Sequence, residues 1–527
     1  VAEESVAHTF LQGMDSEDVF DPSERLAALS SRPIPEKVTE DAPRVLHISM
    51  YCYKSFPIRI FHVLSLKDGI DSHAVFFKNN FTNDHLPVSD RELDLLVDLV
   101  RDVDPHLITF SVLAPYVVAT RKAIERIRRV SNAMIMLGGK YPTIAPHEAL
   151  EFADYACKGD GDLIILRIHE RLRNGEDLRG IRGLWYKDDH GQVVDMDQET
   201  LYQDMDHIPY PAIGEIQMHF IEKNALSNVD PELFDDEMLI MAGRGCVYLC
   251  SFCVNSLLIP MNRGNGRFVR LRSPEHVLEE INYRLSKCRR PSIITFNDEV
   301  FGVFDDWVAD FAKVYKENCD IPFECELVPR LVKEHNMELL ADAGMVSMHF
   351  GVQSGHDDVR KNIMHRPGSN DELIEKSDIL KRVGITPQYD IILDNPFDSM
   401  ESLSEALRLI LAFGTPIKLN TYKMQYFPHY PFTNMALEAG HVGPEQVTDE
   451  GIADAVMYNM VYRPKFPAFN RRDYLENCIY LIPWTIPWLR RILISLQKQH
   501  NPVLAMLVTV IAQIRYKQDF QHSPLVV

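Results

Sequence analysis

Basic residues and long apolar runs are scarce in this sequence, and both absences exclude classes of function. The 527 residues include 55 Lys and Arg against 76 Asp and Glu, which gives a formal net charge of −21. Because this excess of negative charge repels phosphate backbones, we expect no nucleic-acid partner. No uninterrupted apolar run reaches the ~18 residues that a membrane-spanning helix needs. The opening residues VAEESVAHTF lack a basic stretch followed by an apolar one, so we expect no secretory signal.

Cysteine is also sparse, with nine residues in the whole chain. A small, odd number argues against a disulfide framework and favours a reducing, cytoplasmic location. Small buried apolar roles explain best the cysteines that show no metal-ligand spacing, which are Cys157, Cys288, Cys319, Cys325 and Cys478. These five therefore indicate no auxiliary metal cluster.

The first half of the chain predicts a doubly wound α/β domain. Overall composition is that of a globular protein, with 46% hydrophobic and 25% charged residues. Residues 1–41 are polar and predict an N-terminal extension, whereas residues 42–200 alternate apolar runs with helical patterns. The expected strands are residues 44–50, 72–78, 107–112, 133–138 and 154–158, followed by a hairpin in residues 181–194. Such alternation implies a parallel sheet, with a ligand site beyond the carboxyl ends of its strands.

A second alternation follows residues 201–236, which we interpret as a linker. Its expected strands are residues 237–243, 292–297, 322–327, 346–352, 387–393 and 418–427. Six β/α units over residues 237–440 predict a partial barrel with its chemistry at the carboxyl ends of the strands. Residues 441–527 are rich in aromatic residues and proline, and predict a helical C-terminal domain.

The most specific motif is GRGCVYLCSFCVN, which places Cys246, Cys250 and Cys253 in CxxxCxxC spacing directly after the first barrel strand. Thiolates are soft ligands suited to iron–sulfur clusters, and three of them on one loop can hold three irons of a cubane. The fourth iron then stays open. A zinc site would require a fourth protein ligand nearby, and no Cys or His pair follows at suitable spacing.

This motif and barrel resemble the radical S-adenosylmethionine (SAM) enzymes. Further matches are RSPEHVLEEI (272–281), FNDEVF (296–301), ELVPRL (326–331), AGMVSMHFGVQSG (343–355), HRPGS (365–369) and YDIILDNP (389–396). The resemblance implies a four-iron, four-sulfur (4Fe-4S) cluster on the three cysteines, with Phe252 as the aromatic residue of the motif. It also implies that SAM binds the open iron and is cleaved to a 5′-deoxyadenosyl radical. An electron donor such as flavodoxin or ferredoxin would supply the reducing equivalent.

The resemblance also implies contacts to SAM at the strand ends. Asp298 and Glu299 follow the second barrel strand, where the family places polar groups for the SAM ammonium. Gln353 and Ser354 follow the fourth strand, where many relatives have Glu–Ser. Arg330 and Arg366 are candidate partners of the SAM carboxylate. Each of these side chains could instead satisfy a backbone group or cap a helix.

The first domain resembles the cobalamin-binding domain that precedes the barrel in one large subfamily. SVLAPY (111–116), LGGKYPT (137–143) and KGDGD (158–162) follow successive strands. By this resemblance Ser111, Leu113, Gly138 and Gly139 approach the nucleotide tail of the cofactor. The DxHxxG motif that ligates cobalt is absent. His73 is interpreted as incidental, so cobalamin is expected without a histidine ligand.

The resemblance to the cobalamin-containing subfamily implies a methyltransferase that acts on an unactivated carbon of a small-molecule or lipid-like substrate. The alternative is a cyclisation or rearrangement that uses both cofactors without transferring methyl. A non-catalytic corrinoid sensor is disfavoured by the intact cysteine triad. The apolar stretches 479–497 and 502–512 favour helices packed over the barrel mouth, and a helix pair on a membrane surface is the less favoured reading.

Overall fold

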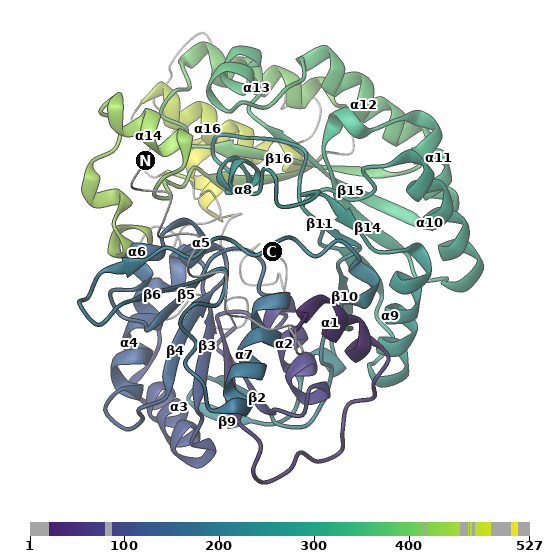
Figure 1. Ribbon diagram of the computed structural model, residues 1–527. Helices are drawn as coiled ribbons and strands as arrows, with labels where there is room; N and C mark the ends of the chain where they lie inside the picture. Colours follow the sequence, from purple (N-terminus) through teal and green to yellow (C-terminus); the bar gives the residue numbers. More distant parts are fainter. Residues whose placement is uncertain are drawn as a thin grey trace, which may run out of the picture.

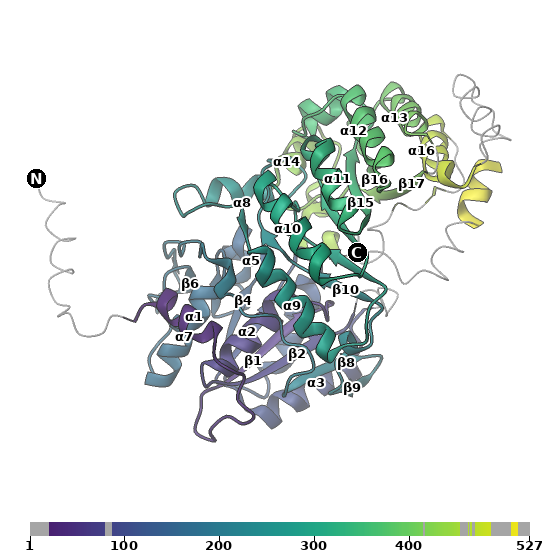
Figure 2. The same cartoon turned by 90° about the vertical axis from the view of Figure 1, so that its right-hand side faces the viewer.

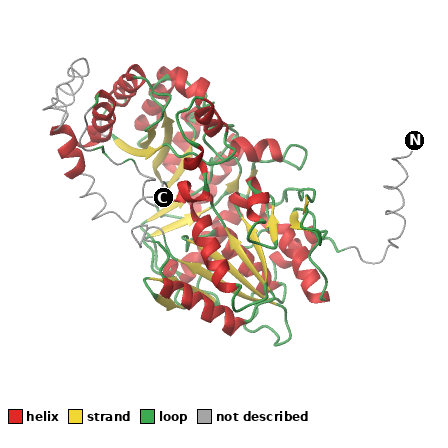
Figure 3. Cartoon of the chain, turned by 90° about the vertical axis from the view of Figure 1, so that its left-hand side faces the viewer, coloured by secondary structure: helices red, strands yellow, loops and turns green. Residues whose placement is uncertain are grey.

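The computed structural model describes residues 20–79, 87–414, 417–453, 462, 464, 465, 470–485 and 507–514. These residues form two α/β units that lie one above the other in Figure 1. In each unit helices surround the strands, as Figure 3 shows. The predicted division into a doubly wound domain and a β/α barrel is therefore confirmed.

The first unit is built on a nine-stranded sheet with the order β7-β6-β5-β4-β3-β1-β2-β8-β9. Its strands are β1 (Arg44–Met50), β2 (Asp71–Phe77), β3 (Leu107–Ser111), β4 (Met134–Gly138), β5 (Tyr155–Cys157), β6 (Leu184–Lys187), β7 (Val193–Val194), β8 (Met218–Glu222) and β9 (Ala225–Ser227). Strands β1 to β5 and β8 pair in parallel, whereas β6, β7 and β9 pair antiparallel to their neighbours. The order reverses between β1 and β3, which is the point where doubly wound sheets bind ligands.

Helices cover both faces of this sheet because the side chains that its strands place on each face are apolar. Leu46 and Ile48 of β1 pack with α3 and α4, whereas Val45 packs with α1, α2 and α7 on the other face. The helices are α1 (Pro22–Ser30), α2 (Phe56–Lys67), α3 (Asp90–Val103), α4 (Val117–Ile127), α5 (Lys140–Ile144), α6 (Pro146–Ala149) and α7 (Asp162–Asn174). Two apolar cores, one on each face, thus hold the carboxyl ends of the strands at one edge.

The segment 201–236 is more than the linker that its proline content predicts. Strand β8 pairs in parallel with β2, and β9 turns back along it. Both strands are short, and β9 is exposed along its whole length, so the sequence lacks the apolar run that marks a buried strand. Part of the N-terminal extension is also folded: Leu26 and Leu29 of α1 are fully buried in the first unit.

The second unit is a six-stranded parallel sheet in sequence order, from β10 to β17. Its strands are β10 (Glu237–Ile240), β13 (Ile293–Phe296), β14 (Phe323–Leu327), β15 (Met345–Gln353), β16 (Thr386–Leu393) and β17 (Lys418–Lys423). Outside them lie α9 (Pro274–Lys287), α10 (Asp305–Asn318), α11 (Glu334–Asp342), α12 (Asn370–Arg382) and α13 (Met400–Ala412). Within the described residues β10 and β17 do not pair, so the barrel is partial, as predicted.

The C-terminal region is helical where the structure describes it. Helix α14 (Pro431–Glu438) follows β17, and α16 (Arg471–Leu481) packs against α13. The Tyr462 N–H donates to the carbonyl of Thr421 on β17, at 3.0 Å. Most of the apolar stretches 479–497 and 502–512 lies outside the described residues. The predicted packing over the barrel mouth and the alternative of a membrane-surface helix pair therefore stay predictions. No described helix combines the length and apolarity needed to cross a membrane.

A buried chain of charges joins the two units. Arg59 on α2 donates to Asp230 at 2.8 Å and contacts Glu232 at 2.8 Å, and Glu232 in turn contacts Arg284 on α9 at 3.0 Å. The chain continues through Glu280 to Arg272, at 2.8 and 2.5 Å. No side chain among the six is more than 8% exposed. Figure 2 shows α9 standing beside the first unit. Three guanidinium groups balance three carboxylates, so the network is neutral as a whole.

Replacing Arg59 with Met should destabilise the protein strongly. The substitution leaves Asp230 and Glu232 buried without their cation, and breaking a buried pair from one side costs about 3–5 kcal/mol. The free energy of unfolding from urea titration measures the loss. Arg101→Met is the control, because Arg101 and Asp98 are 56% and 58% exposed and such pairs contribute less than about 1 kcal/mol. Equal losses in the two variants would contradict a stabilising role for the network.

Candidate active site

The three cysteines lie on the loop between β11 (Gly243–Arg244) and α8 (Asn255–Met261), just beyond the carboxyl end of β10. Gly245 opens this loop with φ +97°, and a Cβ there would lie 2.4 Å from the Phe268 carbonyl oxygen. Only glycine fits this backbone without strain. The loop is anchored at Ser251, whose N–H and Oγ donate to the carbonyls of Met364 and Ile363 at 3.0 and 2.6 Å. The cysteines are therefore presented by a fixed backbone.

The three thiols lie close enough for their charges to act on one another. Cys250 is 5% exposed, and Cys246 and Cys253 are half-buried. Burial, together with the nearby Cys253 and Cys250, raises the pKa of the Cys246 thiol to about 11. No three Cys, His, Asp or Glu side chains within the described ranges converge on a single ion. A cubane puts each thiolate on a different iron, so three thiolates can hold a cluster without converging on one ion.

A cation and an aromatic side chain flank the thiols. Arg366 Nη1 lies 3.7 Å from Cys250 Sγ, while its Nε donates to the Gly351 carbonyl at 3.0 Å. A Cβ on Gly351 would lie 2.6 Å from the Arg366 guanidinium, so this glycine leaves room for the side chain. Phe252 packs beside the buried cluster of Met364, Met424 and Phe432. The positive charge of Arg366 suits anionic sulfur ligands.

The acids after β13 hold the cysteine loop. Glu299 accepts the Gly245 N–H at 3.2 Å and lies 4.0 Å from Lys140 Nζ of the first unit. Asp298 is 2% exposed, and its Oδ2 accepts the Ala242 N–H at 3.1 Å. Its Oδ1 has no partner among the described residues. Burial, reinforced by the charge of Glu299, raises the pKa of Asp298 to about 8. Lys140 links the units here; it lies in the LGGKYPT turn, which predicts no role for it.

The other residues predicted to contact SAM are Gln353, Ser354 and Arg330. Gln353 ends β15 with φ +67°, and its amide lies beside Gly351. The buried Ser354 hydroxyl accepts the N–H of His356 at 3.3 Å. Arg330 is 59% exposed and faces Glu372 at 3.8 Å. The structure brings the cysteines, Glu299, Gln353 and Arg366 to one edge, and all the SAM contacts stay predictions.

The predicted cobalamin contacts lie at the carboxyl edge of the first sheet. Ser111 ends β3 in register with Gly138, the last residue of β4. Leu113, which follows β3, is a large apolar side chain that is 42% exposed. Gly139 has φ +98°, and a Cβ on it would meet the Val112 carbonyl at 2.9 Å. A Cβ on Gly138 would meet nothing closer than 3.8 Å. The protein itself requires glycine at position 139, whereas a Cβ on Gly138 would make only ordinary van der Waals contacts.

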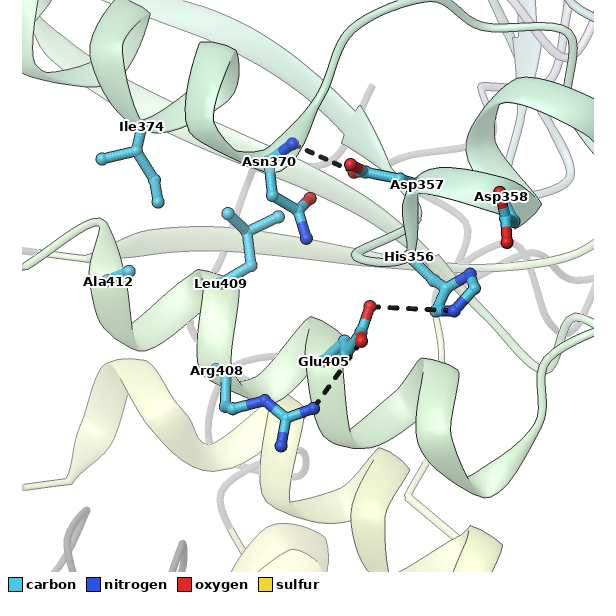
Figure 4. A pocket seen from close by; sticks show the side chains of 9 residues that line it. All are labelled: His356, Asp357, Asp358, Asn370, Ile374, Glu405, Arg408, Leu409 and Ala412. Atoms are coloured by element: carbon cyan, nitrogen blue, oxygen red, sulfur yellow. Dashed lines mark hydrogen bonds and ion pairs between the residues drawn. The ribbon is translucent and has the colours of Figure 1, made fainter.

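Two histidine-containing features lie away from this edge. His73 sits near the amino end of β2 and contacts His219 at 3.1 Å. A pocket of about 560 Å³ lies between α12, α13 and the segment after β15, with His356 3.7 Å from Glu405 (Figure 4). None of the cysteines lines that pocket. The chemistry of the thiols therefore places the candidate site at the strand ends instead.

Comparison with known proteins agrees with this geometry. The family model of the Radical SAM superfamily matches residues 240–410. Residues 240–410 are a radical SAM domain. The match begins at the end of β10 and includes the cysteine loop, the acids after β13 and strands β14 to β16. The chain accordingly carries a radical SAM domain, and a second α/β unit precedes that domain.

Relatives extend the likeness to both units. An uncharacterized methyltransferase of Pyrococcus horikoshii is 22% identical over 64% of this chain and 70% of its own. The cobalamin-dependent radical enzyme OxsB shares the fold with TM-score 0.62 and 15% identity, over 91% of this chain and 75% of that one. The methyltransferase TsrM from Kitasatospora setae gives TM-score 0.56 and 16% identity, over 76% and 77%. These structures show that the radical SAM domain and the doubly wound unit occur together in one fold.

Asp298 should give the stability of the metal-free protein a distinctive pH dependence. Its native pKa of about 8 exceeds the usual 3.8, so between these values the native state holds a proton that the unfolded chain has released. Stability therefore falls as the pH rises through this window. Asp298→Asn cannot ionise and still accepts the Ala242 N–H, so its melting temperature should rise relative to the parent protein from pH 4 to pH 8.

The control is Asp320→Asn. Asp320 is a surface carboxylate whose hydrogen bond and ion pair with Arg290 lower its pKa, so its replacement should show no such relative gain. A constant difference in melting temperature between Asp298→Asn and the parent protein across this range would show that Asp298 is ionised in the native state.

Proposed function

We propose that this radical SAM protein is a cobalamin-dependent methyltransferase that acts on an unactivated carbon of a small molecule. One observation carries the proposal. Strand β4 ends at Gly138, where an added Cβ would meet only ordinary contacts, and α5 begins two residues later with Lys140. Lys140 lies 4.0 Å from Glu299 beside the cysteine loop. A ligand on the first unit and a cluster on the second would therefore meet at one junction.

The cysteine loop fits a 4Fe-4S cluster with one open iron. Three thiols on a fixed backbone supply three ligands, and Arg366 beside Cys250 offsets part of the negative charge of the thiolates. When bound, such a cluster supplies an electron that cleaves SAM to a 5′-deoxyadenosyl radical. The residues of this chain have separate tasks there: Glu299 orients the loop through the Gly245 N–H, and Gln353 offers an amide for SAM.

The first unit fits a corrinoid with a displaced nucleotide tail. Ser111 and Gly138 lie side by side at the ends of β3 and β4, next to the reversal of strand order. The Thr143 hydroxyl donates to the Gly139 carbonyl at 2.8 Å and accepts the Gly159 N–H at 3.2 Å, which holds the loops after β4 and β5 together. When bound, cobalamin supplies a methyl group that polar chemistry could not deliver to a C–H carbon. A protein reductase such as flavodoxin or ferredoxin would provide electrons.

Gly138 offers a direct test of the cobalamin site. Gly138→Val should leave the fold intact, because the added Cβ meets only ordinary contacts, yet its side chain would occupy the space assigned to the nucleotide tail. We expect cobalamin affinity, measured by absorbance titration, to fall by at least ~10-fold, equivalent to about 1.4 kcal/mol. His73→Ala is the control and should bind cobalamin normally. Unchanged cobalamin affinity in Gly138→Val would show that the nucleotide tail does not lie against Gly138.

Methyl transfer itself is tested with SAM that carries a deuterated methyl group. The reconstituted protein should form S-adenosylhomocysteine, 5′-deoxyadenosine and labelled product in comparable amounts, quantified by mass spectrometry. Protein with Cys246, Cys250 and Cys253 replaced by Ala should form no 5′-deoxyadenosine, because it cannot hold the cluster. Substrate consumption with neither label in the product nor S-adenosylhomocysteine would reject methylation in favour of cyclisation or rearrangement.

A further inference from the structure

The inner face of the barrel is polar below the cysteine loop. Alternate side chains of four neighbouring strands point away from the apolar core under the helices. They are Glu324 and Glu326 on β14, Ser347 and His349 on β15, Gln388 and Asp390 on β16, and Asn420 and Tyr422 on β17. The residues between them, such as Cys325, Phe350 and Tyr389, are buried in the helix-facing core. Figure 1 labels β14, β15 and β16 in the upper unit, and Figure 2 shows β17 beside β16.

Most of these polar groups satisfy one another. The Gln388 amide donates to Glu324 at 3.1 Å and to the Ser347 hydroxyl at 2.8 Å. Asn420 donates to Asp390 at 2.8 Å. His349 lies 3.7 Å from Asp390 and 4.0 Å from Glu324. Burial lowers the pKa of His349, but its hydrogen bond to Asp390 and the charges of Asp390, Glu326 and Glu324 outweigh this and raise it.

Glu326 is the carboxylate of this ladder that these pairings leave out. Its strand lies inside the sheet between β13 and β15, yet the side chain is exposed, so open space must lie in front of it. Among the described residues nothing hydrogen-bonds to its carboxylate. Surrounding protein limits its hydration, and this desolvation, together with the charges of Asp390 and Glu299, raises its pKa to about 7 against the opposing charges of His349 and Lys140.

The charges facing this space do not balance. Among the described residues, four carboxylates lie around this space, and Lys140 and His349 are the cations that act on Glu326. The carboxylates are Glu299, Glu324, Glu326 and Asp390. Lys140 lies nearest to Glu299 at the rim, and His349 lies between Asp390 and Glu324. Negative charge is therefore in excess even when His349 is protonated, and it is concentrated around the unpaired Glu326. A bound cation would offset part of this negative charge and pair with Glu326.

We propose that Glu326 binds a cationic nitrogen, an amine or a guanidinium, on the substrate of this enzyme. The inference rests on the proposed function, because it takes the inside of the barrel as the substrate site. The expected substrate is then amphipathic rather than purely lipid-like, and its charged end points down the barrel. Asp390 and His349 support the site as positioning residues, since they shape the field around Glu326 and are already engaged with each other.

Three matched probes test the proposal by direct binding to the full, reconstituted protein. Phenethylamine, phenethyl alcohol and hydrocinnamate have a similar apolar body and differ in charge. Isothermal titration should show the amine binding at least ~10-fold more tightly than the alcohol, as expected for a charge-assisted hydrogen bond, and the carboxylate binding weakest. Glu326→Gln should abolish the preference for the amine. Glu338→Gln on α11 removes an equal charge from a side chain that is 60% exposed outside the barrel, and should retain it.

Equal binding of amine and alcohol by the parent protein would overturn the inference, and so would an amine preference that survives Glu326→Gln. If Glu326→Gln fails to fold, as judged by its melting curve, Glu326→Asp should weaken the amine selectively because it shortens the reach of the carboxylate. SAM cleavage by the parent protein is assayed separately. SAM cleavage without a preference for the amine would support the proposed function and reject this inference. A preference for the amine without SAM cleavage would support this inference and reject the proposed function.

Discussion

Everything at the candidate site depends on the fixed docking of two separately built units. The cysteines belong to the barrel and the glycine turns to the doubly wound sheet, so no single core positions them together. The buried network from Arg59 to Arg272 performs this task. It begins on α2, passes through Asp230 and Glu232, and ends at Arg272, which donates to the carbonyl of Met241 at 2.9 Å, five residues before Cys246. Removing any one partner would leave an uncompensated buried charge, so the docking depends on the complete network.

A second set of ion pairs repeats this arrangement nearer the chemistry. Arg244 and Arg270, on the ribbon formed by β11 and β12 (Arg270–Leu271), contact Asp162 and Asp160 of the first unit at 2.5 and 2.8 Å. The ribbon therefore joins the cysteine loop to the loop after β5. Because both sets involve backbone next to a cofactor loop, a shift of one unit would move cysteines and glycine turns relative to each other. The geometry that a shared substrate needs is thus built into the contacts between the units.

Periodicity and spacing in the sequence were enough to predict the two sheets and the cysteine loop. Strand β1 coincides with its predicted range, and the other long strands differ by a few residues at their ends. Local patterns could not predict β8, because its pairing with β2 is set by a partner about 140 residues away. The Arg59 network and the role of Lys140 were also invisible, since each joins residues that only the folded chain brings together. Polar residues at alternate positions of β14 and β16 did carry a signal for the barrel interior, but this alternation is equally typical of a strand facing solvent.

The hydrogen bond from Tyr462 to Thr421 has a consequence for the open side of the barrel. Strand β17 ends the sheet, and an edge strand left bare offers its unpaired N–H and carbonyl groups to any other strand it meets. Backbone from the C-terminal region occupies part of that edge. A chain cut short before Tyr462 would keep every cysteine and every glycine turn, yet would be prone to edge-to-edge self-association. In such a truncated protein, aggregation would precede any loss of cofactor chemistry.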